Sequence, residues 1–323
     1  MRQGAAAPSA LESMRLVVAA RRYYLEGMTK SAVADELGVS RFKVARLLDE
    51  ARRTGVVTIE IAPPSDVDVD LSLAVADRFG LRQALAVRLT ADPSLRRRQL
   101  GSAAAAVLGD LVEEGDVLGV AWGRTLAEMV RALPALPAAT VVQVVGSVPS
   151  AELEVSSLDL ARGIAGRAGA DLHALHVPMV VDDPETARLL RRDAQVSGTI
   201  EMFGRLSKAL VSIGSWHEHE SSLMLALPDA LRSDIAGAGA VADVCATVLD
   251  EDGREVTVGN LARRTIAITA DQLRAVPDVI AVVGGTGRAR AVAAALRSGL
   301  VHRLVIDVPT ALAMLDAVDD RQA

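Results

Sequence analysis

Two glycine-rich segments of the sequence combine the residue types that hold small anions. Gly123-Arg124-Thr125 and Gly284-Gly285-Thr286-Gly287-Arg288 each follow a short apolar run and open a helical pattern. The first N–H groups of a helix are free, and together with the helix dipole they attract phosphate. Glycine lets the backbone approach the ligand, while threonine adds a hydroxyl and arginine a positive charge. One such loop is more simply a tight turn, but two of them favour a small anionic ligand.

Further polar residues stand directly after other short apolar runs. Runs of this kind are typical of parallel strands, and ligands of open parallel sheets bind in the crevice beyond the carboxyl ends of the strands. The residues that follow the runs are therefore the ligand candidates. By this argument the candidates are Gly123, Arg124, Thr125, Gly146, Ser147, Gly214, Ser215, Gly284, Gly285, Arg288 and Asp307.

A second group of cationic and hydroxyl side chains lies near the N-terminus. Arg41, Lys43 and Arg46 are long enough to reach base edges in a major groove, where arginine–guanine contacts are the commonest specific kind. Lys30, Ser31, Arg52 and Arg53 suit phosphates, which position a protein on DNA without reading its sequence. The alternative is a helical hairpin with solvated charges. The complete set of DNA-binding candidates is Lys30, Ser31, Ser40, Arg41, Lys43, Arg46, Arg52 and Arg53.

The elements around these cations predict a helix-turn-helix, which favours DNA binding over the solvated hairpin. A first helix is expected over residues 11–26, and Thr29 stands as the N-cap of a short second helix. Gly38 permits a tight turn, and Ser40 can cap the third helix, whose opposite face is cationic. Its apolar stripe is formed by Val44, Leu47, Leu48 and Ala51. Residues 56–61 are β-branched and predict a strand, a short β wing.

The rest of the chain alternates strand and helix patterns, which predicts an α/β fold. Strands are expected over 83–89, 117–121, 140–145, 172–177, 209–213, 280–283 and 301–306. Helices are expected over 71–79, 94–114, 125–133, 158–168, 186–193 and 288–297. This order predicts a doubly wound, mostly parallel sheet covered by helices. We therefore expect a DNA-binding domain over 1–62, a linker rich in Pro and Asp over 63–70, and a ligand-binding domain over 71–323.

Composition narrows the class of protein. The 323 residues carry 35 Lys and Arg against 41 Asp and Glu, a net charge of −6. Residues 1–62 hold ten of the cations and seven of the acids, so a small basic part precedes an acidic body, and a polyanion should bind the former. No apolar run approaches the roughly 18 residues of a membrane span, so we expect a cytoplasmic protein with no membrane partner. The single cysteine, Cys245, excludes an internal disulfide.

Familiar catalytic and metal signatures are absent from the sequence. There is no P-loop, no G-x-S-x-G elbow, and Arg290 stands where the third glycine of a dinucleotide fingerprint would be. His173 and His176 should face opposite sides of a strand, and the neighbouring pair His217 and His219 lacks a carboxylate–histidine helix motif. We therefore expect no catalytic residue, no metal and no cofactor.

Residues from about 15 to 317 resemble the SorC/DeoR family of sugar-binding transcriptional regulators. The resemblance rests on five blocks in the same order and spacing. They are Leu37-Gly38-Val39-Ser40-Arg41 with Val44-Ala45-Arg46-Leu47-Leu48, Leu118–Leu126, Ile213-Gly214-Ser215, Gly239–Asp243, and the stretch from Pro277 to Leu296.

The resemblance implies a winged-helix-like N-terminal domain and a large domain similar to the glucosamine-6-phosphate deaminase and ribose-5-phosphate isomerase fold. It implies a homotetramer, with a dimer as the alternative, and a phosphorylated sugar as effector. The loop Gly123-Arg124-Thr125 matches the one that holds the effector phosphate, and Asp243 joins the effector candidates. Three positions depart from the pattern: Lys30 replaces Gln, Ala242 replaces Gly, and Arg288 replaces a Lys, which keeps the charge but changes its geometry.

Two functions from different classes follow from these observations. The first is a transcriptional regulator of carbohydrate metabolism whose operator binding depends on a sugar phosphate. The alternative is a sugar-phosphate isomerase or deaminase, for which Asp243 and Asp307 are the candidate general bases. An enzyme would gain nothing from residues 11–61, so the regulator is favoured. A Schiff base is not expected, because two of the three lysines lie in the DNA-binding part and only Lys208 remains.

Overall fold

The computed structural model describes residues 10–59, 66–90, 92–148, 155–216 and 221–319. The chain divides into two compact units, Met1–Ala62 and Pro63–Ala323. We call the second unit the body. None of the helices in the described ranges is long and apolar enough to cross a membrane.

The first unit is a bundle of three helices, α1 (Ala10–Ala20), α2 (Lys30–Leu37) and α3 (Arg41–Arg53), with α1 continued by a π-helical turn over Arg21–Leu25. The predicted caps are present. The Oγ1 of Thr29 accepts a hydrogen bond from Ala32 N at 3.2 Å, and the Oγ of Ser40 accepts one from Lys43 N at 3.2 Å. Gly38 between them has a φ of 62°, the left-handed conformation that the turn requires. The predicted helix-turn-helix is confirmed.

The predicted β wing is wrong for the residues that the structure describes. Residues 56–59 form bends and coil, and Glu60 and Ile61 lie outside the described residues. Val57 N donates instead to the Ala51 carbonyl at 2.9 Å, so the chain folds back onto the end of α3. A lone strand leaves its own N–H and C=O groups unpaired, and residues 10–59 contain no other extended segment that could pair with it.

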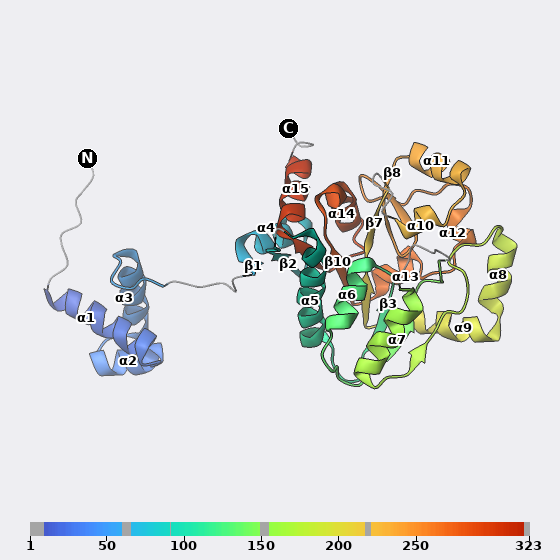
Figure 1. Ribbon diagram of the computed structural model, residues 1–323. Helices are drawn as coiled ribbons and strands as arrows, with labels where there is room; N and C mark the ends of the chain where they lie inside the picture. The colour runs from blue at the N-terminus through green and yellow to red at the C-terminus, as the bar shows by residue number, and fades with distance from the viewer. Residues whose placement is uncertain (1–9, 60–65, 91, 149–154, 217–220, 320–323) are drawn as a thin grey trace. The chain divides into compact units, whose positions relative to one another are not determined.

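The body is built on an eight-stranded sheet in the order β1-β2-β11-β10-β6-β3-β4-β5, in which only the edge pair β1–β2 is antiparallel (Figure 1). The strands are β1 (Val67–Asp68), β2 (Gln83–Val87), β3 (Val117–Val120), β4 (Thr140–Gln143), β5 (Leu172–His173), β6 (Lys208–Val211), β10 (Asp278–Val283) and β11 (Arg303–Asp307). The predicted doubly wound, mostly parallel sheet is confirmed. Residues 67–70, expected in the linker, belong instead to β1 and to the start of α4, because Val67 pairs with Val87.

Helices cover both faces of this sheet (Figure 1). One face packs against α5 (Pro93–Leu111), α6 (Arg124–Ala132) and α7 (Ser157–Ala168). The other packs against α4 (Val69–Phe79), α8 (Pro184–Arg192), α9 (Ala194–Glu201), α14 (Ala289–Arg297) and α15 (Val308–Asp319). The other helical segments are α10 (Ser222–Leu225), α11 (Asp229–Gly237), α12 (Leu261–Arg264), α13 (Ala270–Ala275) and the 3-10 turns Met202–Arg205 and Thr286–Arg288. Side chains of each strand alternate between the two cores, as a sheet buried on both faces requires.

A second, antiparallel sheet was not predicted. It consists of β7 (Ile213–Ser215), β8 (Ala240–Val244) and β9 (Thr247–Asp250). The single strand expected over 209–213 is in fact divided: β6 ends at Val211 and the chain then enters the second sheet as β7. The strand expected over 172–177 ends at His173, because Leu175 N donates to the side chain of Gln143 and leaves the sheet.

Candidate functional site

The chain order reverses in the middle of the large sheet, and this reversal locates the candidate site. From β3 the chain moves outward through β4 and β5, whereas β6 is followed by β10 and β11 on the other side of β3. Loops that leave β3 and β6 at their carboxyl ends therefore separate and open a crevice. Ala121 and Trp122 follow β3, Gly146 comes three residues after β4, and Ser212 follows β6, and all four line one cavity.

Two cavities lie at this edge. The first, which we call the Asp243 cavity, is lined by residues from the ends of β3 and β6 and from the loop after β4. Its lining includes Trp122, Arg124, Gly146, Ser157, Gly214, Asp243 and Arg288. The second, which we call the arginine cavity, is lined by Leu89, Thr90, Arg96, Arg97, Leu100, Arg124, Gly284–Arg288, Asp307 and Pro309. Arg124 and Arg288 belong to both linings, so the two cavities adjoin.

Helix α6 begins at the junction of the two cavities. A Cβ at Gly123 would lie 2.6 Å from the Cβ of Ser212, so only glycine lets the start of α6 come this close to the end of β6. Arg124, the first helical residue, is exposed toward both cavities. Thr125 is buried, with 7% of its surface exposed, and lines neither cavity. The helix start thus presents backbone and a guanidinium to the cavities, whereas most of the surface of Thr125 is buried.

Asp243 is a buried carboxyl on β8 that forms part of the cavity wall. It pairs across the small sheet with Gly214, where a Cβ would lie only 2.3 Å from the carboxyl Oδ1. Burial raises the pKa of Asp243 to about 6, against the lowering influence of neighbouring Ser221, Trp216 and Arg288. Its Oδ1 accepts no hydrogen bond from any residue in the described ranges. A buried acceptor without a partner is costly, and a ligand hydroxyl would satisfy it.

The floor of the Asp243 cavity is a fixed polar network. Gln143, fully buried at the end of β4, donates from Nε2 to Ser157 Oγ at 2.8 Å and to the Val145 carbonyl at 2.9 Å. Its Oε1 accepts from Leu175 N at 2.9 Å. Trp122 Nε1 donates to the Val155 carbonyl at 2.7 Å, which ties the chain before α7 to the chain after β3. These contacts hold the Ser157 hydroxyl at the cavity with its orientation already set.

The wall between the Asp243 cavity and a neighbouring cavity is a two-residue turn. Cys245 and Ala246 join β8 to β9 with φ angles of 49° and 67°, both in the left-handed region. Both residues line the Asp243 cavity and also the next one, which extends over Thr247 and Thr265. Burial, with a smaller effect of Asp243, raises the pKa of the Cys245 thiol to about 12. The thiol therefore stays protonated and serves as a wall, not as a nucleophile.

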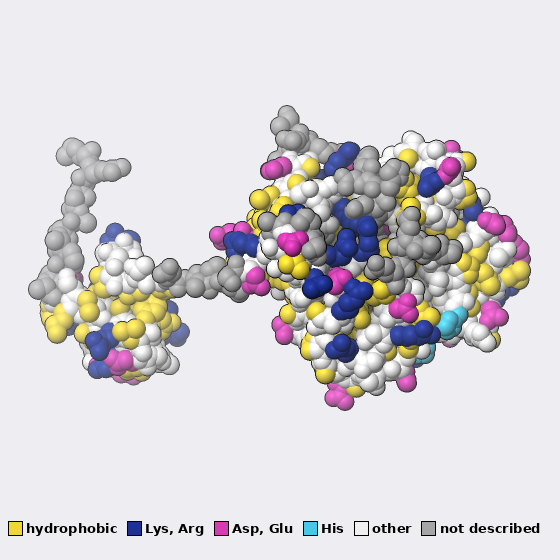
Figure 2. Space-filling model, viewed as in Figure 1, with side chains coloured by type: hydrophobic (Ala, Val, Ile, Leu, Met, Phe, Trp, Pro, Cys, Tyr) yellow, Lys and Arg dark blue, Asp and Glu magenta, His cyan; other side chains and the backbone are white. Residues whose placement is uncertain are grey.

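The arginine cavity is shaped by a clamped glycine loop. Asp307, which is 5% exposed, accepts Gly285 N at 2.8 Å through Oδ2 and Thr310 N at 2.9 Å through Oδ1, and also the Thr310 hydroxyl. A Cβ at Gly284 would lie 2.6 Å from Asp307 Oδ2 and 2.7 Å from the side chain of Leu100. Arg96, Arg97, Arg124 and Arg288 surround this loop. In Figure 2, Lys and Arg side chains gather in a cluster over the middle of this face of the body.

The predicted site residues thus divide into two groups. Those that line a cavity are Arg124, Gly146, Gly214, Asp243, Gly284, Gly285, Arg288 and Asp307. Four predicted residues, Gly123, Thr125, Ser147 and Ser215, belong to neither lining, and Ser215 is only 1% exposed. Sequence reasoning missed Arg96, Arg97 and Ser157. The run Arg96-Arg97-Arg98, shortly after the first predicted strand, was the available signal for the first two.

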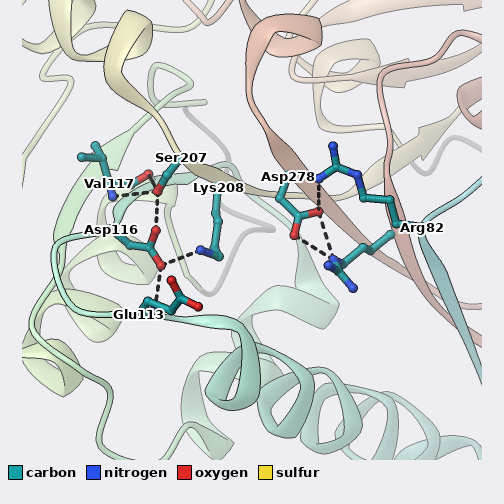
Figure 3. A network of polar contacts seen from close by, with 8 residues as sticks. Arg82, Glu113, Asp116, Val117, Ser207, Lys208 and Asp278 are labelled. Atoms are coloured by element: carbon teal, nitrogen blue, oxygen red, sulfur yellow. Dashed lines mark hydrogen bonds and ion pairs between the residues drawn. The ribbon is translucent and has the colours of Figure 1, made fainter.

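Charged residues at the opposite edge of the same sheet pair with one another (Figure 3). Lys208 begins β6 and donates from Nζ to Asp116 Oδ2 at 2.6 Å, and Ser207 Oγ donates to Asp116 Oδ1 at 2.7 Å. Asp278 begins β10 and accepts Arg303 Nε at 2.7 Å. Because Lys208 lies at the amino end of its strand, it is remote from both cavities, in agreement with the expectation that no Schiff base forms.

The DNA-binding candidates lie on and around α3. Arg41 and Arg46 are exposed, whereas Lys43 is half-buried. Two candidates are held by acids one turn away on the same helix, Arg52 by Asp49 and Arg53 by Glu50. The other candidates are Lys30, whose Nζ lies 5.7 Å from the ring centre of Tyr23, and the exposed hydroxyl residues Ser31 and Ser40.

Phe42 is a further residue of α3 that the sequence did not single out. It is 81% exposed, at the second position of the helix and between two cationic candidates. The available signal was an aromatic residue outside the apolar stripe. A phenylalanine can contact the methyl group of thymine. Two of the histidines considered above, His217 and His219, lie outside the described residues.

The chain is similar to known proteins over most of its length. Residues 65–316 match the family described as "Putative sugar-binding domain". The chain is 30% identical over 298 residues to the uncharacterized transcriptional regulator YjhU of Escherichia coli (strain K12), covering 90% of each chain. It is 29% identical over 316 residues to the sorbitol operon regulator of Klebsiella pneumoniae, covering 94% of this chain and 98% of that one. The crystal structure of full-length SorC from Klebsiella pneumoniae superposes with a TM-score of 0.73 at 26% identity, over 94% and 99% of the two chains.

Proposed function

The chain belongs to the SorC/DeoR family of sugar-binding transcriptional regulators, and from that premise we propose that a phosphorylated sugar in its body controls operator binding by α3. The observation that carries the proposal is the pair of adjoining cavities at the carboxyl ends of the strands, with Arg124 and Arg288 common to both. A buried carboxyl faces one cavity and a cluster of arginines the other. The two cavities thus match a molecule that has hydroxyl groups at one end and a phosphate at the other.

In the proposed complex the sugar occupies the Asp243 cavity. The Oδ1 of Asp243 would accept a sugar hydroxyl, and Ser157 Oγ offers a second polar contact at the floor. The phosphate would lie at the start of α6, between the guanidinium groups of Arg124 and Arg288. Charge-assisted hydrogen bonds from arginine to phosphate are roughly twice as strong as neutral ones, so this end contributes most of the affinity.

Ligand binding is tested by a thermal-shift screen of the full-length protein against sugars and their phosphates, with inorganic phosphate as the control. A ligand at 100 times its Kd adds about 2.7 kcal/mol to the stability of the protein that binds it. We expect one phosphorylated sugar to raise the Tm while its free sugar does not. A shift produced by the free sugar alone would mean that the arginines do not hold a phosphate.

Operator binding is proposed to depend on Arg41 and Arg46, with Phe42 as an apolar contact to thymine. Replacing either arginine with alanine should cost about 1–3 kcal/mol of operator affinity if it forms a bidentate contact with guanine. Arg53→Ala is the matched control, because Arg53 is already paired with Glu50 and is expected to meet only phosphate. Fluorescence anisotropy on the operator measures all three variants. Equal and small losses in all of them would remove the recognition role of α3.

We propose that the body binds its sugar without turning it over. The named relatives are transcriptional regulators. Of the two candidate bases, Asp307 already accepts hydrogen bonds from Gly285 N and from the amide and hydroxyl of Thr310. Incubating the protein with the phosphorylated sugar from the screen, followed by NMR of the sugar, tests this. Conversion into an isomer or a deaminated product would assign an enzyme.

We further propose an oligomeric state, a cellular location and a division of roles between the two domains. The family resemblance supports a homotetramer, which light scattering after size-exclusion chromatography distinguishes from a dimer. Because the proposed partner is operator DNA, we place the protein in the bacterial cytoplasm. The two compact units, residues 1–62 and 63–323, are proposed as the DNA-binding and effector-binding parts, and separate expression of each part tests this division.

A further inference from the structure

We propose that the cavity on the other side of the Cys245–Ala246 turn is a separate binding site, for a small monocarboxylate with an aliphatic body. We call it the threonine cavity, because Thr247, Thr257, Thr265 and Thr269 belong to its lining. The inference goes beyond the function proposed above. None of the side chains assigned there to the effector lines this cavity.

The cation of the threonine cavity is Arg191, the penultimate residue of α8. Its guanidinium donates to the carbonyls of Ala262 and Arg263, at 3.5 Å each, and to that of Thr265. Carbonyl dipoles at a helix end favour a cation, but they bring no full negative charge. No acid in the ranges that the structure describes contacts this guanidinium. Arg191 is therefore a half-buried cation in the cavity wall that lacks a carboxylate partner.

The acid of the lining, Glu255, does not compensate this charge. Its Oε1 accepts a hydrogen bond from Arg274 at 2.9 Å instead. The pKa of Arg191 is lowered by burial alone, without an opposing influence from Glu255 or any other charged group. Burying a charge without a counter-charge is costly, and an anion bound in the cavity would supply the missing partner.

The rest of the lining indicates the class of anion. Most of the side chains are apolar, and Val248, Leu261 and Ile268 among them are buried. One guanidinium suits one carboxylate, to which it forms charge-assisted hydrogen bonds. A sugar or a sugar phosphate would place hydroxyl groups against apolar walls, where they lose their hydrogen bonds to water. The cavity therefore fits a carboxylate with an aliphatic body better than it fits a sugar.

The position of the guanidinium is fixed by the packing of α8 against α12 (Figure 1). Before α8, Val181 N donates to the Arg264 carbonyl at 3.0 Å, and Arg264 Nε donates to the Val181 carbonyl at 2.9 Å. After α12, Thr265 Oγ1 donates to the Leu261 carbonyl at 2.8 Å. These contacts hold in place the carbonyls that receive Arg191. A group that is already ordered loses little freedom when a ligand binds, which favours affinity.

The experiment compares three probes that differ in one property each. Isovalerate has a carboxylate and a branched aliphatic body, isovaleramide replaces the carboxylate with a neutral amide, and acetate lacks the branched body. Saturation-transfer NMR titrations of the full-length protein at pH 7.5 measure their affinities. We expect isovalerate to bind about tenfold more tightly than isovaleramide, the effect of one charge-assisted contact, and about tenfold more tightly than acetate, the effect of the buried methyl groups. Equal affinities of isovalerate and isovaleramide, or no binding of isovalerate, would overturn the inference.

Arg191→Gln and Arg192→Gln form the matched pair of variants. The two arginines are adjacent at the end of α8 and their replacement changes the net charge equally, but Arg192 is exposed and only Arg191 belongs to the lining. Arg191→Gln should bring the affinity for isovalerate to within about twofold of that for isovaleramide. Arg192→Gln should preserve the preference for the carboxylate. Equal effects of the two variants would assign the preference to net charge and would contradict the proposed site.

A third variant covers the case in which Arg191→Gln does not fold. Ala262 is exposed on α12 and lines the cavity, so Ala262→Leu narrows the cavity and leaves Arg191 in place. Both isovalerate and isovaleramide should then bind at least about tenfold more weakly. Unchanged binding by the folded Ala262→Leu protein would show that the probes bind elsewhere.

A crystal structure with isovalerate locates the probe. A carboxylate within hydrogen-bond distance of the Arg191 guanidinium supports the inference. A carboxylate found only beside Arg124 and Arg288 overturns it and makes isovalerate a ligand of the Asp243 cavity. Neither outcome decides the proposed function, which the screen of phosphorylated sugars tests separately.

Discussion

The two edges of the large sheet use charge in opposite ways. At the amino ends of the strands, Lys208 is paired with Asp116 and Arg303 with Asp278, at distances of 2.6 and 2.7 Å (Figure 3). At the carboxyl ends, the two cavities are lined by four arginines and two aspartates. The same strands thus begin in charged pairs and end at cavities whose linings contain more arginines than aspartates.

This difference separates residues that hold the fold from residues that line the candidate site. The side chains of Lys208 and Asp116 are only 13% and 10% exposed, so neither could be buried without the other. Burial raises the pKa of Asp116, but the hydrogen bonds from Lys208, Ser207 and the Glu113 amide outweigh it and hold the pKa below its usual value. Asp243 shows the reverse, with a pKa raised to about 6. The hydrogen-bond donors around Asp116 thus account for the opposite directions of the two pKa shifts.

The largest effect is expected from breaking a pair at the amino edge. Lys208→Met leaves the Asp116 carboxylate partly buried and unpaired, which should cost about 3 kcal/mol in the free energy of unfolding, measured in urea at pH 7. Effector affinity should stay within twofold, because Lys208 lies at the far end of β6. The double variant with Asp116→Asn should recover part of the loss. Lost effector binding in a protein of unchanged stability would reverse the roles of the two edges.

An intermediate effect is expected at the carboxyl edge. Arg288→Gln removes a guanidinium that lines both cavities, so the affinity for the phosphorylated effector should fall about tenfold to a hundredfold, or about 1.4–2.7 kcal/mol. Arg290→Gln is the control, since Arg290 is exposed, pairs with Glu251 and lines neither cavity. If both variants lose affinity equally, charge alone and not position sets binding at this edge.

The smallest effect is a pH dependence that distinguishes Asp243 from Asp116. Because the pKa of Asp243 is raised in the folded protein, its contribution to stability is largest below pH 4 and is lost as the pH rises through about 6. Between pH 5 and 7.5 this loss amounts to about 1 kcal/mol. In Asp243→Asn the loss disappears, so the Tm difference between variant and parent should move in favour of the variant as the pH rises. A constant difference across this range would show that the carboxyl is already balanced by a partner.

The sequence predicted the main elements because their patterns are local. The Thr29 and Ser40 caps, the Gly38 turn and the alternating strands and helices follow from short-range rules, and the structure contains them. The edge of the sheet at which the candidate site lies could also be predicted, since parallel strands place their carboxyl ends together. The loops after β3, β4, β6 and β10 were therefore found without knowing the order of the strands.

What the sequence could not predict depends on contacts between distant segments. Arg96 and Arg97 face the glycine loop only because α5 packs closely on α6 and Leu100 lies beneath Gly284. Thr125 is 7% exposed and lines neither cavity, although its position in a Gly-Arg-Thr loop suggested contact with a ligand. The predicted β wing was wrong because a strand also needs a partner strand from elsewhere in the fold. Residues 56–59 have strand propensity, but the first unit offers them no partner strand in its described part.

The turn at Cys245 and Ala246 places two engineering goals in opposition. A residue other than glycine costs about 1–2 kcal/mol in the left-handed conformation that both of them adopt. Ala246→Gly would remove that cost and yield a more heat-resistant protein. The same change would delete the Cβ that stands between two compartments and merge their edges, admitting bulkier molecules. Thermal robustness and ligand discrimination are therefore opposing traits at this position, and a redesign that improves one weakens the other.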